Sequence, residues 1–82
     1  MTKQTITEQY PTNDLGLAAA LITRGHFIEA LDRDNLRKVR FIFLKTPELI
    51  IDADSYWADE LTVYARAYFN NVKMLKNRIY SE

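Results

Sequence analysis

The sequence predicts a single small α+β domain in which an antiparallel hairpin packs against three helices. Three features of its 82 residues point to this class. An apolar run with three consecutive alanines is typical of a buried helix, two β-rich runs flank a polar turn, and two later segments carry apolar residues at helical spacing. The expected order is α-β-β-α-(β)-α over residues 10–82, behind a flexible N-terminal tail of residues 1–9. The bracketed element is residues 61–63, which fit either a linker or a third short strand.

The first helix is expected over residues 14–24. Thr12 or Asn13 can cap it by accepting a hydrogen bond from a free backbone N–H group, and Asp14 suits the positive end of the helix dipole. Apolar side chains surround most of this helix, so we expect it to be buried on more than one side. Gly25 follows as a C-cap glycine.

Two strands are expected next, over residues 26–31 and 36–45, around the polar turn 32–35. Successive side chains of a strand point to opposite faces of the sheet. In the second strand one face therefore holds Val39, Phe41 and Phe43, and the other holds Lys38, Arg40, Ile42 and Leu44.

Two further helices complete the predicted domain. Thr46 and Pro47 are typical of an N-cap and a first helical residue, and they predict a helix that runs to about residue 58. The last helix is expected over about residues 65–80. Its apolar residues recur at helical spacing, at Tyr68, Val72, Leu75 and Ile79.

Several short motifs stand in a definite order along the chain. The stretch PTNDLGLAAAL at residues 11–21, followed by Gly25-His26, resembles the opening of a family of short bacterial and phage domains of unknown function. Later motifs of that family follow in order, as Val39-Arg40-Phe41-Ile42-Phe43, Tyr56-Trp57, Tyr68-Phe69 and Leu75-Lys76. The resemblance implies a small stand-alone domain, common in mobile or viral gene neighbourhoods, and it brings no agreed activity, cofactor or catalytic residue.

The chain departs from that family at the start of the last helix. In the family, a helix start of the Asp-Pro type tends to precede the Tyr-Phe pair. This chain has Tyr64-Ala65 at that place. We therefore expect the last helix to begin without the usual capping chemistry.

The composition excludes several classes of protein. The 11 basic and 11 acidic residues give a net charge of zero, which argues against a strongly basic protein that coats DNA. Without cysteine the chain has no disulfide framework, thiolate metal site or cysteine nucleophile. No apolar stretch approaches the roughly 20 residues that span a bilayer, and residues 1–9 lack the apolar segment of a secretory signal. We therefore expect a cytoplasmic protein with no membrane partner.

We expect no catalytic residue, no cofactor and no metal. The two glycines form no phosphate-binding loop. His26 is expected to begin a strand and to bond a local carbonyl, since no spacing places a catalytic partner beside it. Glu48 and Asp52 are one turn apart and could hold a divalent cation only with further oxygen ligands. Solvated helix surface explains most of the acidic block, which comprises Glu48, Asp52, Asp54, Asp59 and Glu60.

Aromatic residues are the first candidate binding feature. The chain has five Tyr, four Phe and one Trp, and a domain of this size cannot readily bury all of them. Half-exposed Tyr and Trp are favoured at interfaces. The candidate interface residues are Tyr56, Trp57, Tyr64 and Tyr68. From them we predict a homo-oligomer, with a homodimer as the expected form.

Basic residues are the second candidate feature. Lys38 and Arg40 share one face of a predicted strand, and no acidic residue interrupts the last helix between its basic residues. The candidate anion or nucleic-acid contacts are Lys38, Arg40, Lys73, Lys76 and Arg78. Two plainer explanations stand beside this one, because lysine on a strand protects a sheet edge and basic residues suit the polar face and C-terminal end of a helix.

Taken together, the residues favour a non-catalytic small binding protein over an enzyme. The predicted function is that of a phage- or mobile-element-associated homo-oligomer that engages a host or phage macromolecule, in regulation or in interference with a host system. One alternative is a nucleic-acid-binding protein that uses the basic hairpin and the last helix. Another is a sponge that sequesters a small anionic nucleotide between subunits.

Overall fold

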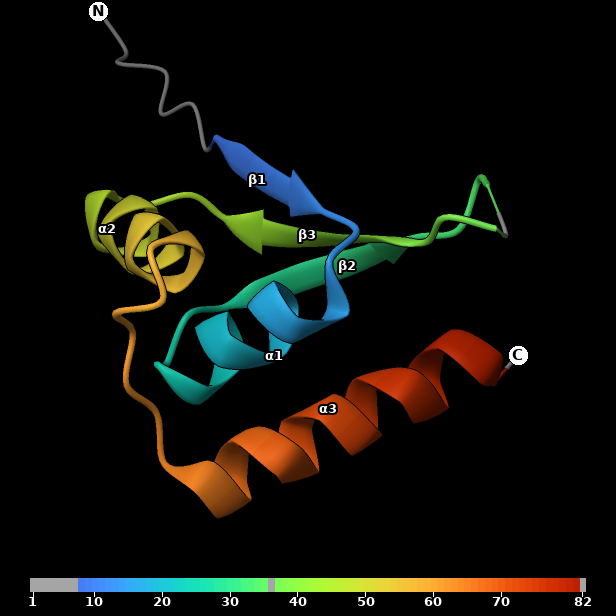
Figure 1. Ribbon diagram of the computed structural model, residues 1–82. Helices are drawn as coiled ribbons and strands as arrows, with labels where there is room; N and C mark the ends of the chain where they lie inside the picture. The colour runs from blue at the N-terminus through green and yellow to red at the C-terminus, as the bar shows by residue number, and fades with distance from the viewer. Residues whose placement is uncertain (1–7, 36, 82) are drawn as a thin grey trace, which may run out of the picture.

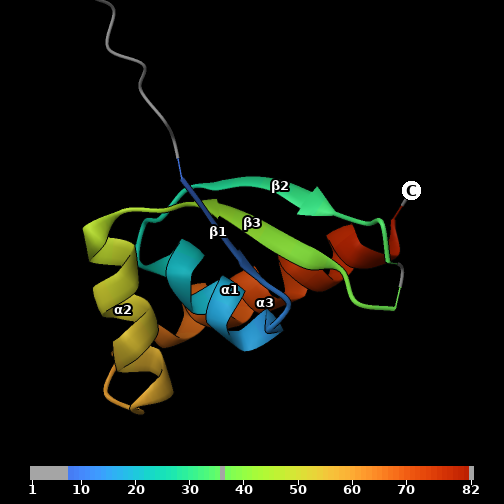
Figure 2. The same cartoon turned by 90° about the horizontal axis from the view of Figure 1, so that it is seen from above.

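The structure is a computed structural model, and it describes residues 8–35 and 37–81. Its elements are β1 (Gln9–Thr12), α1 (Leu15–Thr23), β2 (Ile28–Asp32), β3 (Arg40–Leu44), α2 (Pro47–Trp57) and α3 (Ala65–Tyr80) (Figure 1). Figure 2 shows the helices on one side of the sheet. The predicted α+β class, the antiparallel hairpin and the three helices are therefore confirmed within the described residues.

The third strand comes from the N-terminal end of the domain, where it overlaps the end of the predicted flexible tail. β1 pairs antiparallel with β3, and Gln9 lies opposite Leu44, so Gln9 belongs to the sheet. Pro11 is tolerated because β1 is an edge strand, in which proline can leave its missing N–H on the open side. Of the rest of the expected tail, Glu8 is exposed and precedes the strand, and residues 1–7 lie outside the described residues. Residues 61–63 form a linker and no strand.

β3 is the central strand of the sheet, whose order is β1-β3-β2. Phe41 and Phe43, which the alternation of the sequence places on one face, project from β3 into the core and are almost completely buried. Both strands of the hairpin begin later than expected. β2 begins at Ile28, because the two residues before it follow the end of α1, and β3 begins at Arg40, because residues 37–39 stay in the turn.

α1 lies between the sheet and α3, and α2 packs against it at one end of the domain (Figure 1). Residues 17–21 of α1 are all buried, which confirms the expectation that this helix is buried on more than one side. The N-cap is Asp14, whose Oδ1 accepts a hydrogen bond from the Leu17 N–H at 2.7 Å. Thr12, which was expected as a cap, instead ends β1 and accepts a bond from the Asp14 N–H at 3.1 Å. Asn13, the other expected cap, lies one residue before the N-cap position.

The core is assembled around α1. The apolar face of β3 covers one side of the helix, and residues of α2 and α3 cover the others. The buried cluster consists of Leu17, Ala18, Ala19, Leu21, Phe41, Phe43, Leu49, Ala53 and Leu75. Three alanines in the helix give its neighbours room to approach closely, because their side chains are short.

α1 and α2 end in the same backbone motif. After α1, the N–H of Gly25 donates to the Ile22 carbonyl and that of His26 donates to the Leu21 carbonyl, which is a Schellman motif. Gly25 has a φ of 95°, in the left-handed region where glycine carries no steric penalty. Its predicted role as a C-cap glycine is confirmed.

After α2, Asp59 takes the place that glycine holds after α1. Its φ is 61°, its N–H donates to the Tyr56 carbonyl, and the N–H of Glu60 donates to the Ser55 carbonyl. Aspartate tolerates the left-handed region better than most residues, but less well than glycine. Because no glycine marks this turn, the motif could not be predicted from the sequence.

α3 starts without a side-chain cap and ends against a basic residue. Tyr64 occupies the N-cap position and makes no capping hydrogen bond, as the departure from the family pattern implied. At the other end, the Arg33 guanidinium donates to the carbonyl oxygens of Arg78, Ile79 and Ser81. A cation is favourable there because the C-terminal end of a helix carries partial negative charge.

The hydroxyl groups of two tyrosines meet the first turn of α1. Tyr68 donates to the carbonyl of Gly16 at 3.4 Å, and Tyr56 donates to Oδ1 of Asp14 at 3.5 Å. A methyl group on Gly16 would overlap the Tyr56 hydroxyl and would lie 3.3 Å from the Tyr68 hydroxyl. Gly16 therefore permits the close approach of α2 and α3 to α1.

We expect Gly16→Ala to lower the free energy of unfolding by about 1–3 kcal/mol, because overpacking outweighs the gain in helix propensity. Urea denaturation measures the change. Tyr56→Phe removes the overlapping hydroxyl, so the double variant should recover most of the loss. If the two substitutions are merely additive, the overlap is not the cause.

Candidate binding site

A hollow opens at the end of the domain where α2 turns toward α3. We call it the aromatic hollow, and its volume is about 430 Å³. It is lined by Ala20, Tyr56, Trp57, Asp59, Leu61, Val63 and Tyr68. Three of the four predicted interface residues thus come from two different helices to line one hollow.

The two tyrosines of the hollow are held in place and Trp57 is open to solvent. Tyr56 and Tyr68 are half-buried, with their hydroxyl groups on α1 as described above. Trp57 is 61% exposed and meets the Tyr56 ring edge-on, with the ring centroids 5.1 Å apart. Burial, followed by the nearby charge of Asp14, raises the pKa of Tyr56, so its phenol stays protonated. The hollow therefore has a firm inner wall and one exposed aromatic ring at its mouth.

The fourth predicted interface residue, Tyr64, lies beside a second hollow of about 390 Å³. We call it the linker hollow, and it is lined by Thr23, Arg24, Thr62, Val63 and Tyr64. Val63 borders both hollows, so the linker between α2 and α3 runs between them. Tyr64 is 83% exposed and is the most open of the four.

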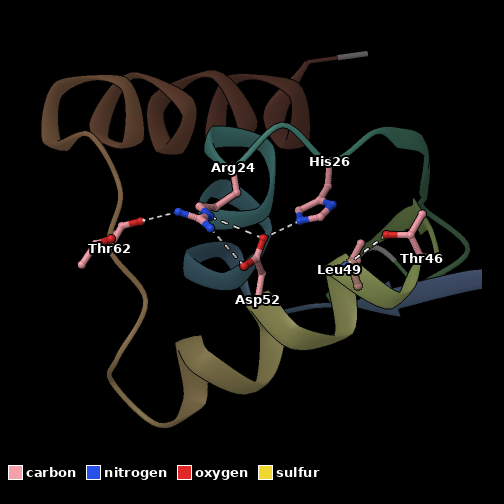
Figure 3. A network of polar contacts seen from close by, with 6 residues as sticks. All are labelled: Arg24, His26, Thr46, Leu49, Asp52 and Thr62. Carbon is pink, nitrogen blue, oxygen red and sulfur yellow. Dashed lines mark hydrogen bonds and ion pairs between the residues drawn. The ribbon is translucent and has the colours of Figure 1, made fainter.

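A buried carboxylate holds this end of the domain together (Figure 3). Asp52 of α2 lies 2.6 Å from Nε2 of His26 through Oδ2, and the Arg24 guanidinium donates to both of its oxygens at 3.4 Å. Because the carboxylate can only accept, we assign the proton to Nε2 of His26. Arg24 also donates to the Thr62 carbonyl at 3.3 Å, and so ties the linker to α1 and α2.

These contacts correct two expectations from the sequence. Asp52 is only 9% exposed and is not part of a solvated helix surface. His26 does not begin a strand, because it follows the end of α1, and its side chain bonds Asp52 instead of a local carbonyl. Glu48, the proposed partner of Asp52 in a cation site, is exposed, and the described residues contain no group of three potential ligands.

A signal for the burial of Asp52 was present in the spacing. Asp52 lies three residues after Leu49 and four before Tyr56, within the stripe that faces the core. A carboxylate on such a stripe needs a buried partner. Its partners, however, lie 26 and 28 residues away in the chain, so only the fold identifies them.

The surroundings of Asp52 set its protonation. Burial by itself would raise its pKa, but hydrogen bonds from His26 and Arg24, together with the charge of Arg24, hold the pKa of Asp52 below its ordinary value of 3.8. The carboxylate is therefore ionised at neutral pH and keeps its contacts to both residues.

The charge at this end of the domain is strongly one-sided. From residue 46 to residue 65 the chain has five acidic residues and no basic one. Asp52 is paired with Arg24, and the other four acidic residues are exposed: Glu48, Asp54, Asp59 and Glu60. Asp59 belongs to the wall of the aromatic hollow, which therefore combines aromatic rings with negative charge.

The predicted basic contacts are only partly brought together. Arg40 forms an ion pair with Asp32, with the two closest atoms 2.6 Å apart, so its charge is compensated. Lys38 lies in the turn after β2, where it lines a hollow together with Ile79 and Tyr80 of α3. The other three, Lys73, Lys76 and Arg78, are exposed on α3. Lys38 thus lies beside the C-terminal end of α3, and it also lines a hollow with Arg40.

We expect Asp52→Asn to lower the free energy of unfolding by about 2 kcal/mol at neutral pH, since charge-assisted hydrogen bonds to His26 and Arg24 are lost. A lowered pKa in the folded state stabilises the protein above the unfolded value of 3.8, and this contribution is lost as the pH falls below it. Urea denaturation at a series of pH values should show the two proteins converging below that pH. A constant difference across the series would contradict this prediction.

None of the described helices is long and apolar enough to cross a membrane. No curated protein and no solved structure matches the chain. A family model described as a domain of unknown function, DUF5659, matches residues 7–81. Because the match spans nearly the entire sequence, the chain belongs to the DUF5659 family.

Proposed function

We propose that the protein is a non-catalytic binding domain whose aromatic hollow receives a positively charged segment of a protein partner. The observation that carries this proposal is the joining of three aromatic rings and Asp59 in one hollow, within a stretch that has no basic residue. The phage or mobile-element setting and the cytoplasmic location stay predictions from the sequence.

Aromatic exposure is the first support. Trp57 and Tyr64 are large side chains that remain open to solvent at this end of the domain. Tyr and Trp are enriched among the residues that dominate binding energies, because they bury much area while ordering few torsions. A partner that covers them would gain most of its affinity at this end.

Charge is the second support, and it indicates a cationic occupant. Lys and Arg side chains bind over the faces of aromatic rings and pair with carboxylates. Asp59 supplies the carboxylate from a left-handed backbone position at which glycine would be less strained. A residue that keeps a strained backbone position beside a hollow is a candidate for a role in binding.

The linker that separates the two hollows is held before any partner arrives. Arg24 bonds the Thr62 carbonyl while its other contacts secure it to Asp52. A surface that is already ordered loses less conformational entropy on binding. The buried cluster around Asp52 thus supports the hollow without lining it.

The test uses a short peptide of alternating arginine and glycine as the probe, with a glutamine-glycine peptide as the uncharged control. The chain has one tryptophan, so a saturable change in Trp57 emission should report occupancy of the hollow. NMR spectra of the ¹⁵N-labelled protein should show shifts concentrated at residues 56–64 and at Tyr68. Equal binding of the glutamine peptide, or shifts centred elsewhere, would contradict the proposal.

Two substitutions separate binding from folding. Asp59→Asn removes the charge while keeping a residue that tolerates the left-handed region. We expect it to lower the affinity for the arginine peptide at least about threefold. Asp34→Asn, an equal change of charge in the exposed turn after β2, is the matched control. Tyr64→Ser supplies a capping side chain to α3, so it should stabilise the fold by about 1 kcal/mol and still weaken binding.

A homodimer is the second candidate, and the separation of charge in the chain favours it. α3 has four basic residues and no acidic one, whereas residues 46–65 have only acidic charges. Opposite surfaces of this kind attract one another between copies. One copy could therefore offer its α3 to the acidic end of another.

We expect analytical ultracentrifugation to show a dimer whose population falls as the salt concentration rises, because salt screens exposed charges. Lys73→Glu should weaken the dimer, and the uncharged change Asn77→Gln on the same helix is its control. A monomer of 9.6 kDa at every protein and salt concentration would rule out the dimer.

A further inference from the structure

The outer side of α3 is open, and it carries basic charge along its whole length. The helix packs mainly on α1, through residues such as Val72 and Leu75. Figure 1 shows it as the outermost element on the side away from the sheet. Its four basic residues, Arg66, Lys73, Lys76 and Arg78, are all exposed, and the helix contains no carboxylate to compensate them.

The exposed residues form a regular stripe of basic and amide side chains. Arg66, Asn70, Lys73 and Asn77 are spaced by four, three and four residues, so they lie on one face opposite the buried one. Lys73 lies over the ring of Phe69, with its Nζ 5.4 Å from the ring centroid. The stripe thus alternates charge with groups that both donate and accept hydrogen bonds.

The turn after β2 extends this surface at the C-terminal end of α3. Arg33 fastens the turn to the helix through the carbonyl groups of its last residues. Arg37 and Lys38 line a hollow of about 340 Å³ together with Ile79 and Tyr80. One exposed carboxylate, Asp34, lies in the same turn.

We propose that α3, together with Arg37 and Lys38, forms a binding surface for duplex DNA, with the outer face of α3 in the major groove. The 16 residues of α3 make a rod of about 24 Å, and the groove, roughly 12 Å wide, admits one α-helix. Arg and Lys contact phosphates, whereas the amide groups of Asn70 and Asn77 match the donor and acceptor pattern of adenine. Arg37 and Lys38 contact the phosphate backbone of the DNA beside the groove.

The net charge of zero does not oppose this assignment, because the charges are separated. The five acidic residues between residues 46 and 65 lie in α2 and the linker. This is the end of the domain away from the turn after β2 (Figure 1). Such a charge distribution orients the basic side toward DNA and keeps the acidic end away from it. The surface is also separate from the aromatic hollow, so the two proposals can fail independently.

The test is fluorescence anisotropy with a labelled mixed-sequence DNA duplex of about two helical turns, compared with single-stranded RNA of the same length. We expect the duplex to bind more tightly and the logarithm of its affinity to fall with the logarithm of salt concentration, with a slope of roughly −4 for four neutralised phosphates. No binding at about 50 mM salt, or tighter binding of the RNA, would overturn the proposal.

Single substitutions locate the surface. Three substitutions should each weaken the binding of the duplex and reduce the magnitude of the salt slope by about 1: Arg66→Gln, Lys73→Gln and Lys76→Gln. Lys45→Gln makes the same change of charge just after β3, where Lys45 pairs with Glu8 at 3.4 Å, and it should leave both the affinity and the salt slope unchanged. Thermal unfolding confirms that each variant is folded. If Lys45→Gln weakens the duplex as much as the others, the attraction is not carried by α3.

Discussion

The fold depends on the complete burial of one short helix. Residues 17–21 of α1 are buried together, because the sheet, α2 and α3 each cover a different side of that helix. α1 supplies more of the buried core residues than any other described element. Alanines make the close packing possible on the sides of α1, and Gly16 makes it possible at its first turn, where two tyrosine hydroxyl groups arrive from α2 and α3.

This arrangement buries one carboxylate in the interior, and that carboxylate links several elements of the domain. Asp52 reaches across from α2 to His26 and Arg24, which both follow the helical part of α1. Arg24 then reaches the linker. One ionised group therefore fixes the relative positions of α1, α2 and the linker, and through them the mouth of the aromatic hollow. A buried residue that lines neither hollow can thus control the shape of the proposed site.

Both proposed binding roles rest on how charge and aromatic area are distributed over two regions of the domain. The turn from α2 to α3 combines acidic charge with Trp57 and Tyr64, the most exposed aromatic residues there. The outer face of α3 is basic and rich in amide groups. A neutral net charge conceals this separation, because the composition averages over regions that the fold keeps apart. The two regions suit different kinds of partner.

The sequence by itself determined the local structure. Helical spacing predicted α3, Thr46-Pro47 predicted the start of α2, and Gly25 predicted the end of α1, since each of these signals depends on neighbouring residues. Tertiary structure alone decided the rest. It placed β1 beside β3 and paired Asp52 with His26 and Arg24, which lie 26 and 28 positions earlier in the chain. It also compensated the charge of Arg40 through Asp32, while Lys38 stayed beside α3. These contacts join segments that are distant in the chain, and a sequence carries no distance information about such pairs until the core has packed.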